Sequence, residues 1–205
     1  MRAVIIGSAV FVAVVATVSL LAQRSRRDEV SRLAELLSLR EGMTVAEIGA
    51  GTGWLTVEVA RRVGQSGRVY STELSADRLR DIRQAVAEAR LSTVIVLEAG
   101  ERATGLPSAC CDAIFMRRVY HHLTAPSAIL TGIHDALRPG GRLVIIDFRP
   151  DRLIGTVTGM GVDRAEVIRA GTTIGFEVLT ADEWPGWDHY VVTFEKSPGS
   201  SSKTQ

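Results

Sequence analysis

The stretch EIGAGTG at residues 47–53 decides the fold, because three alternate glycines follow a short apolar run, Thr44–Ile48. Glycine lets the backbone turn sharply and lets a ligand approach without a Cβ in the way. The apolar spacing of Trp54–Val63 then predicts a helix, whose first N–H groups point toward the turn. The sequence therefore predicts a strand, a glycine-rich turn and a helix that together form a ligand site.

Downstream of this turn, predicted strands and helices alternate. Further strands are predicted at Gly67–Thr72, Thr93–Leu97, Ala113–Met116 and Leu143–Asp147, and further helices at Ser75–Arg90, Pro126–Leu137 and Asp163–Ile174. Such alternation indicates a mostly parallel sheet with helices on both faces. Two late strands, Phe176–Leu179 and Tyr190–Phe194, lie too close in sequence for a helical crossover, so we expect an antiparallel hairpin. The expected fold class is α/β, a Rossmann-like seven-stranded sheet.

The residues that follow each strand are candidates for binding, because open parallel sheets bind ligands beyond the carboxyl ends of their strands. Glu73 follows the second strand, and its carboxylate can accept both hydroxyls of a ribose. A glycine turn with an acidic residue at this place predicts an adenosine-type ligand.

Four segments resemble the class I S-adenosylmethionine-dependent methyltransferases. VAEIGAGTGWLTVEVA (45–60) resembles their first motif and STELS (71–75) their acidic second one. AGERATGLPSACCDAIFMRRVYHHL (99–123) and ALRPGGRLVIIDF (136–148) resemble the third and fourth motifs and the helix–turn–strand that follows. The resemblance covers Leu36–Phe148 and is closest to small-molecule methyltransferases that include the enzymes of ubiquinone and menaquinone biosynthesis.

The resemblance implies S-adenosylmethionine as cofactor and a role for each matching residue. It places Glu47 near the methionine amino group, Glu73 at the ribose hydroxyls and Leu74 on the adenine face. Glu101 stands where the family often has an aspartate that contacts the adenine amino group, so that contact is longer or passes through water. The remaining implied positions are the loop glycines Gly49, Gly51 and Gly53, and Arg117 beside the methionine end.

A nicotinamide dinucleotide is the chief competing ligand, and it would make the protein an oxidoreductase. Its fingerprint is GxGxxG, with a third glycine that packs the helix on the strand. Here the spacing is GxGxG followed by the bulky Trp54, and Glu47 would repel a pyrophosphate. The positive sulfonium and ammonium of S-adenosylmethionine tolerate that carboxylate, so the residues favour this cofactor.

Methyl transfer asks little of a protein beyond holding the acceptor in line with the sulfonium. A general base is needed only when the acceptor must lose a proton. His121 and His122 lie where such a base could stand, and histidine has a suitable pKa. The alternative is that one histidine caps the next helix while the other is solvated or part of the core. Tyr120 is a catalytic candidate too, as a wall of the acceptor pocket or as ordinary packing.

Composition limits the other functions. The chain has 205 residues and a formal net charge of +1, which argues against a nucleic-acid partner. Metal-binding CxxC and HExxH patterns are absent from the sequence, so we expect no metal site. The two cysteines, Cys110 and Cys111, are adjacent, so no disulfide framework is expected.

The N-terminal sequence predicts a membrane segment. Ala3–Ala22 carries no charge and is long enough for a helix to span the hydrocarbon core. We expect a retained anchor (residues 1–22), with cleavage as a signal sequence and secretion as the alternative. Arg24, Arg26 and Arg27 follow it, and the positive-inside rule then places the body in the cytoplasm.

The expected organisation continues with a basic linker (23–29), a methyltransferase domain (30–196) and a disordered tail (197–205). Only a helix at Val30–Leu39 and the glycine-rich Gly155–Gly161, a lid or a loose connection, are available to cover the acceptor. We therefore expect an open pocket, completed by the membrane or a second subunit.

The expected function is methyl transfer to a small lipophilic acceptor. The alternative is a catalytically silent binding protein of the same fold at the membrane. The acceptor atom and the oligomeric state stay open.

Overall fold

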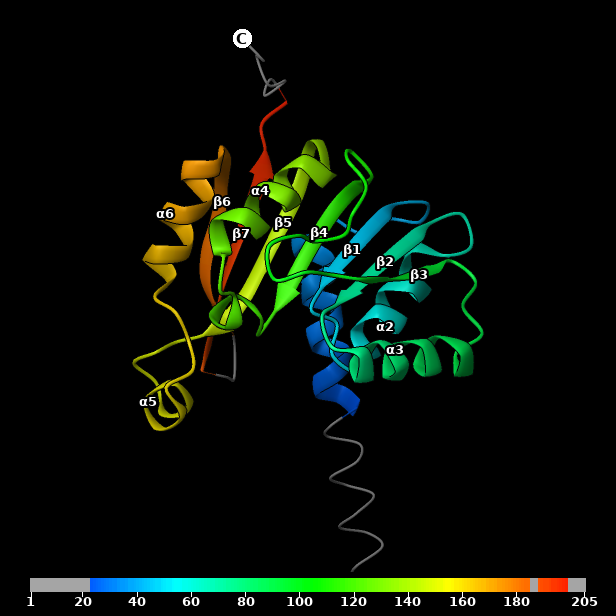
Figure 1. The fold of residues 1–205 in the computed structure, drawn as a ribbon, viewed down its shortest axis with the longest axis horizontal. Coiled ribbons are helices and arrows are strands. Elements are labelled where there is room, and N and C mark those ends of the chain that lie inside the picture. Colours follow the sequence, from blue (N-terminus) through cyan, green and yellow to red (C-terminus); the bar gives the residue numbers. More distant parts are fainter. Residues whose placement is uncertain (1–22, 185–187, 199–205) are drawn as a thin grey trace, which may run out of the picture.

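The computed structural model describes residues 23–184 and 188–198. Seven strands form one sheet in the order β3-β2-β1-β4-β5-β7-β6 (Figure 1). The strands are β1 (Thr44–Ile48), β2 (Arg68–Glu73), β3 (Val94–Glu98), β4 (Cys111–Arg117), β5 (Leu137–Phe148), β6 (Phe176–Trp184) and β7 (His189–Lys196). The helices are α2 (Trp54–Val63), α3 (Ala76–Glu88), η1 (Tyr120–His122), α4 (Pro126–Ala136), α5 (Leu153–Thr158) and α6 (Arg164–Ile174), preceded by a helical segment at 23–36.

Strand directions confirm the predicted mixed sheet. The neighbours from β3 to β5 pair in parallel, whereas β7 is antiparallel to both β5 and β6. The late strands thus form the expected hairpin, and its second strand lies between β5 and β6. The parallel strands end at one edge, which carries the glycine turn after β1.

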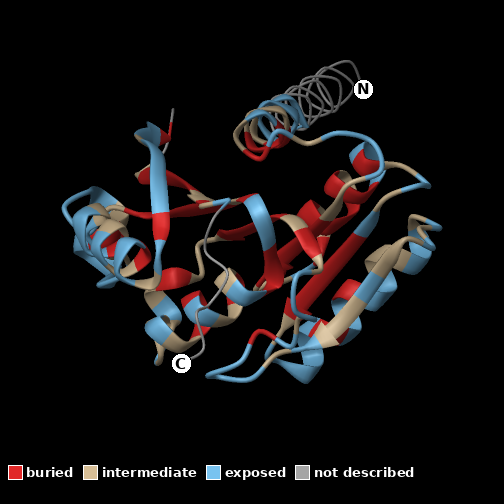
Figure 2. Ribbon diagram, turned by 90° about the horizontal axis from the view of Figure 1, so that it is seen from above, coloured by how far each residue is buried: buried red, intermediate tan, exposed pale blue. Residues whose placement is uncertain are grey.

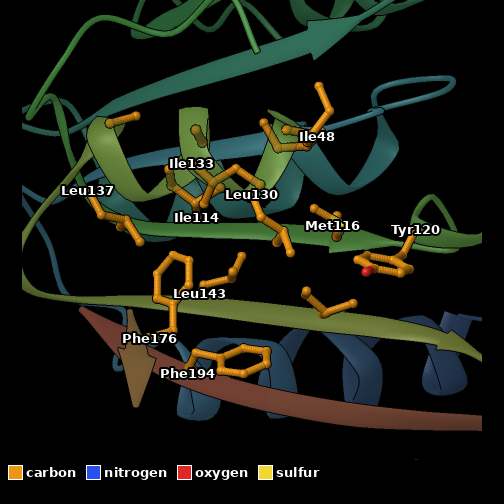
Figure 3. Packing of buried hydrophobic residues seen from close by; sticks show 14 of the residues in the cluster. Ile48, Ile114, Met116, Tyr120, Leu130, Ile133, Leu137, Leu143, Phe176 and Phe194 are labelled. Atoms are coloured by element: carbon orange, nitrogen blue, oxygen red, sulfur yellow. The ribbon is translucent and has the colours of Figure 1, made fainter. Parts of the chain in front are cut away.

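Strand residues alternate between two apolar cores, one on each face of the sheet. Ile114 and Met116 of β4 pack in one core, which α4 and α6 cover, and Figure 3 shows them there beside Leu130 and Ile133 of α4. Phe115 points to the other core, which the 23–36 helix and α2 cover. This alternation follows from the two-residue period of a strand. Figure 2 shows that buried residues run along the central strands.

Three features differ from the expectations or add to them. The chain is helical over 23–36, so helix occupies the stretch expected as a basic linker, and it ends before Leu39. Gly155–Gly161, expected as a lid or loose connection, overlaps the short helix α5. The sulfurs of Cys110 and Cys111 are joined in a disulfide. Because a bond between adjacent residues closes almost no loop, it constrains the unfolded chain very little.

The predicted membrane segment does not fall within the described residues. Within 23–184 and 188–198, no helix has both the length and the apolar character needed to cross a membrane. Ala3–Ala22, and the tail from residue 199 onward, lie outside the described residues.

Candidate functional site

A cavity of about 700 Å³ opens at the carboxyl ends of β1, β2 and β4. Its walls come from the glycine turn, the start of α2, the segment after β3 and the segment between β4 and α4. The polar and charged side chains that line it belong to Glu47, Thr52, Glu73, Arg78, Thr104, Arg117, Arg118 and His122. Apolar lining comes from Leu74, Val119, Leu123 and Ile129, among others. The cavity can thus hold a molecule with charged and apolar parts.

The glycine turn packs against Val119 on one side and lines the cavity on the other. Gly49 adopts φ +69°, and a Cβ there would lie 2.6 Å from the Val119 side chain. Gly51 also has a positive φ (+58°), but a Cβ there would meet no atom within 4 Å. Because Gly51 lines the cavity, that free space is where a ligand can touch the backbone.

Glu73 closes the turn from the end of β2. Its Oε2 accepts a hydrogen bond from the Gly51 N–H at 2.9 Å, and its Oε1 accepts one from the Leu74 N–H at 2.8 Å. A carboxylate offers about four lone-pair positions, so both oxygens can still accept ligand hydroxyls. The carboxylate is thereby fixed at the cavity wall and can accept further hydrogen bonds.

Glu47 has a different environment from Glu73. Its side chain is buried and accepts a hydrogen bond from Thr56 Oγ1, which lies 2.8 Å from Ser71 Oγ. Burial raises the pKa of Glu47 to about 8, while the Thr56 hydrogen bond and the Arg117 charge partly offset the rise. Near neutral pH this carboxyl therefore keeps its proton until a cation is placed beside it.

Arg117 ties the cavity to the N-terminal helix. Its guanidinium forms a two-point ion pair with Glu29, through Nε to Oε1 and through Nη2 to Oε2 at 3.2 Å. The guanidiniums of Arg26 and Arg117 lie over the ring of Trp54, 5.4 and 5.7 Å from its centroid. Such cation–π contacts fix the ring at the cavity wall.

Arg118 occupies the end of β4 in an unusual conformation. Its φ is +59°, a region that residues other than glycine rarely adopt. Its Nε donates to His189 Nε2 at 2.8 Å, and its guanidinium lies 5.1 Å from the centroid of Phe148. Burial and the neighbouring arginine charges lower the pKa of His189 to about 3, so its ring is neutral and can accept this bond.

The turn η1 is fastened to the end of β5 by Asp147, which is fully buried. Asp147 accepts hydrogen bonds from the backbone N–H of His121 at 3.1 Å and of Phe148 at 2.7 Å. Its Oδ1 also lies 2.6 Å from His121 Nδ1. Because a carboxylate only accepts, Nδ1 carries the proton, which leaves the buried Nε2 without one in the neutral ring.

The candidate site residues fall into two groups. Those that line the cavity are Glu47, Gly49, Gly51, Glu73, Leu74, Arg117 and His122. Those outside its lining are Gly53, packed against Ile82, the exposed Glu101, the core residue Tyr120 and the buried His121. The rings of His121 and His122 nevertheless lie 3.9 Å apart between centroids.

Sequence reasoning did not find the partners of these residues. Asp147 could have been found, because it is the last residue of a predicted strand, and Glu73 was singled out as the residue that follows one. The pairing of Glu29 with Arg117 joins residues 88 positions apart and has no local signal.

Comparison with known proteins gives the following relatives. A family model described as a methyltransferase domain matches residues 46–145. The ubiquinone/menaquinone biosynthesis C-methyltransferase UbiE of Escherichia fergusonii is 28% identical over 111 residues, which are 54% of this chain and 44% of that protein. The protein-L-isoaspartate O-methyltransferase of Methanothrix thermoacetophila is 34% identical over 116 residues, 57% of this chain and 52% of that one. The chain therefore spans about half the length of the curated relatives it matches.

Solved structures share the fold. A SAM dependent methyltransferase from Aquifex aeolicus has a TM-score of 0.75 at 24% identity, covering 82% of this chain and 89% of that one. The [4+2]-cyclase SpnF has a TM-score of 0.72 at 17% identity, covering 84% and 81%. Similarity at these identities shows that the architecture is shared. Proteins with the same architecture can catalyse different reactions.

Proposed function

Since the chain belongs to the class I S-adenosylmethionine-dependent methyltransferases, we propose that it transfers a methyl group from this cofactor to a small lipophilic acceptor. The observation that carries the proposal is the joined pair of Gly51 and Glu73 at the wall of the cavity. The apolar lining and the similarity to a C-methyltransferase of quinone biosynthesis support a lipophilic acceptor.

The residues present fit the cofactor. Glu73 would accept the ribose hydroxyls, the free space at Gly51 would admit the ribose and methionine, and Leu74 would lie against the adenine. Glu47 would face the methionine ammonium, and Arg117 would lie beside that end of the cofactor. When bound, the cofactor supplies a methyl group activated by a positively charged sulfonium, so little further chemistry is required of the protein.

The loop glycines and Glu101 complete the proposed cofactor site. Gly49 and Gly53 would shape the loop through their positive φ angles, Gly49 within the cavity lining and Gly53 outside it. Glu101 is exposed and outside the cavity lining, so its contact with the adenine amino group would need a bridging water.

His122 is the proposed proton acceptor for an acceptor that must lose a proton, because its side chain lines the cavity. His121 and Asp147 are positioning residues in this proposal. Asp147 holds both the backbone and the ring of His121, and the His121 ring packs on that of His122. Tyr120 would anchor the turn from within the core.

The segment Ala3–Ala22 is proposed to hold the domain at the cytoplasmic face of a membrane. Its uncharged length and the arginines after it support this location. A tether would raise the local concentration of a lipophilic acceptor at the open cavity. A catalytically silent binding protein at the membrane is the second candidate, because a fold does not by itself fix a reaction.

The first test is calorimetric titration of S-adenosylmethionine into the full-length protein in detergent. We expect binding, weakened at least tenfold in Glu73→Gln, and no heat from NADH. Glu98→Gln is the matched control, because Glu98 pairs with Glu73 in the neighbouring strand, is exposed and does not line the cavity. Absence of binding by the folded protein would refute the proposed cofactor.

The second test measures S-adenosylhomocysteine release with a panel of quinols, phenols and lipids. His122→Gln should lower kcat and remove the acidic limb of the kcat profile at saturating cofactor, with cofactor affinity unchanged. Asp147→Asn should lower kcat while the acidic limb remains. If cofactor binds but no acceptor is turned over, the silent binding protein becomes the better account.

A further inference from the structure

The helix α5 exposes apolar side chains more fully than any other helix or strand among the described residues. Leu153 and Val157 are each 74% exposed, and Met160 just beyond the helix is 39% exposed. Leu153 and Val157 are four residues apart and therefore lie on the same face of the helix. A monomeric soluble surface seldom carries large aliphatic side chains exposed to this degree side by side.

The opposite face of α5 packs against the protein. Gly155 is buried, and a Cβ there would lie 2.2 Å from the backbone oxygen of Arg149, so the helix packs against its own connecting segment. Ile154 N–H donates to Asp188 Oδ2 at 3.1 Å, which joins α5 to the start of the last hairpin strand. Leu153 and Val157 are thus presented outward by a fixed helix.

The apolar face of α5 does not belong to the cofactor cavity. None of residues 153–160 lines it. Figure 1 shows α5 beyond the sheet at the lower edge of the molecule, the edge where the 23–36 helix begins. That helix begins with the exposed Arg24, Arg26 and Arg27, directly after the apolar segment Ala3–Ala22, and Arg152 before α5 is exposed as well.

We propose that α5 is a second membrane contact, which inserts Leu153 and Val157 into the interface of an anionic bilayer. Apolar side chains that enter the interface, flanked by arginines near anionic headgroups, are the features of a surface-binding segment. The inference rests on the proposed tether. A single tether would leave the domain free to rotate, whereas two contacts fix it with the edge that carries the cavity toward the lipid.

The test places a polarity-sensitive nitrobenzoxadiazole probe on cysteines introduced into the full-length protein, reconstituted in phosphatidylcholine vesicles with added phosphatidylglycerol. The variants are Leu153→Cys and Val157→Cys. Val178→Cys is the matched control, because Val178 is an exposed valine two residues into β6, which starts at the opposite edge. Labelling of the parent chain, in which Cys110 and Cys111 are joined in a disulfide, measures the background.

We expect the probes at 153 and 157 to shift to shorter wavelength and to be quenched by acyl-chain quenchers, while the probe at 178 does neither. A vesicle-bound protein whose three probes behave alike would overturn the α5 contact and leave the tether standing. A protein that does not associate with vesicles would overturn both. A shift at 153 and 157 on adding S-adenosylmethionine without vesicles would assign α5 to closing over the acceptor instead.

Discussion

Two carboxylates at the cavity have opposite surroundings. Glu73 accepts hydrogen bonds from the backbone N–H groups of Gly51 and Leu74. Glu47 lies in a buried position with one hydroxyl donor, and its pKa is raised to about 8. Glu73 is therefore a hydrogen-bond acceptor fixed at the cavity wall, whereas the charge on Glu47 depends on whether a cation is near.

This difference predicts a pH-dependent affinity for S-adenosylmethionine. Below about pH 8, Glu47 must release its proton when the cationic methionine end binds, so affinity should rise with pH, approaching tenfold per unit. Titration calorimetry in buffers of different ionisation heat would detect the released proton. Glu47→Gln should bind more weakly above about pH 7 and lose the proton release; a slope that survives in this variant would contradict the assignment.

Gly51 provides a test of backbone access to the cavity. Alanine there meets no protein atom, so the cost to stability should be the left-handed strain, about 1–2 kcal/mol. Binding of S-adenosylmethionine should fall at least tenfold, because the new methyl group occupies the free space at the turn. Gly140→Ala is the matched control, since its φ is +74°, its surroundings are equally open and it lies outside the cavity. Equal losses of affinity in both variants would refute this role.

At the scale of elements, helix α6 lies unusually close to the sheet. A Cβ on Gly171 would lie 2.6 Å from the ring of Phe194 on β7, a side chain with no exposed surface. Alanine stabilises an ordinary helix interior by about 1 kcal/mol relative to glycine. Here overpacking opposes that gain, since forcing a methyl group into a filled core costs about 1–3 kcal/mol.

Gly171→Ala is therefore expected to lower the free energy of unfolding despite the better helix propensity. Gly132 in α4 is the control, because its Cβ would lie 3.3 Å from the Thr104 side chain, which can shift slightly. Denaturation in urea should show a loss of up to about 2 kcal/mol for the first variant and less than about 1 kcal/mol in either direction for the second. Similar values for both would mean that the close approach of α6 is relieved easily.

The elements that the sequence predicted are those with strong local patterns. The runs at Thr44–Ile48 and Ala113–Met116 are almost entirely buried, because each strand is covered on both faces. Helix α5 was missed, since Gly155 and two threonines give its six residues a weak helix propensity. The glycine turn at the cavity wall could be predicted from one continuous stretch of sequence. The Asp147–His121 pair, in contrast, joins residues 26 positions apart.

At the scale of the whole molecule, two buried groups set opposite pH dependences of stability. Glu47 has a pKa of about 8 when folded against 4.5, so the folded state binds the extra proton and stability falls as pH rises through that window. His189 has a pKa of about 3 when folded against 6.5, so the unfolded state binds the extra proton and stability falls as pH drops below about 6.5. Between about pH 4.5 and 6.5 the two effects oppose each other.

We expect these two groups together to favour a stability maximum in that range. Each slope approaches about 1.4 kcal/mol per pH unit for one proton. Thermal and urea unfolding of Glu47→Gln should lose the decline between about pH 6.5 and 8, and His189→Gln should lose part of the decline below about pH 4.5. Parallel stability curves for the parent and both variants would contradict the prediction.

The position of β7 between β5 and β6 affects how the protein can be made. Among the described strands, β6 pairs with β7 alone, and β7 is the last strand in the chain. On the ribosome, β6 therefore emerges before its only partner exists, and β5 keeps an open apolar edge until residues 189–196 arrive. Nascent chains in this state are prone to aggregation. A premature stop codon just before His189 would remove β7, and it should send the product to chaperones and proteases rather than to the folded state.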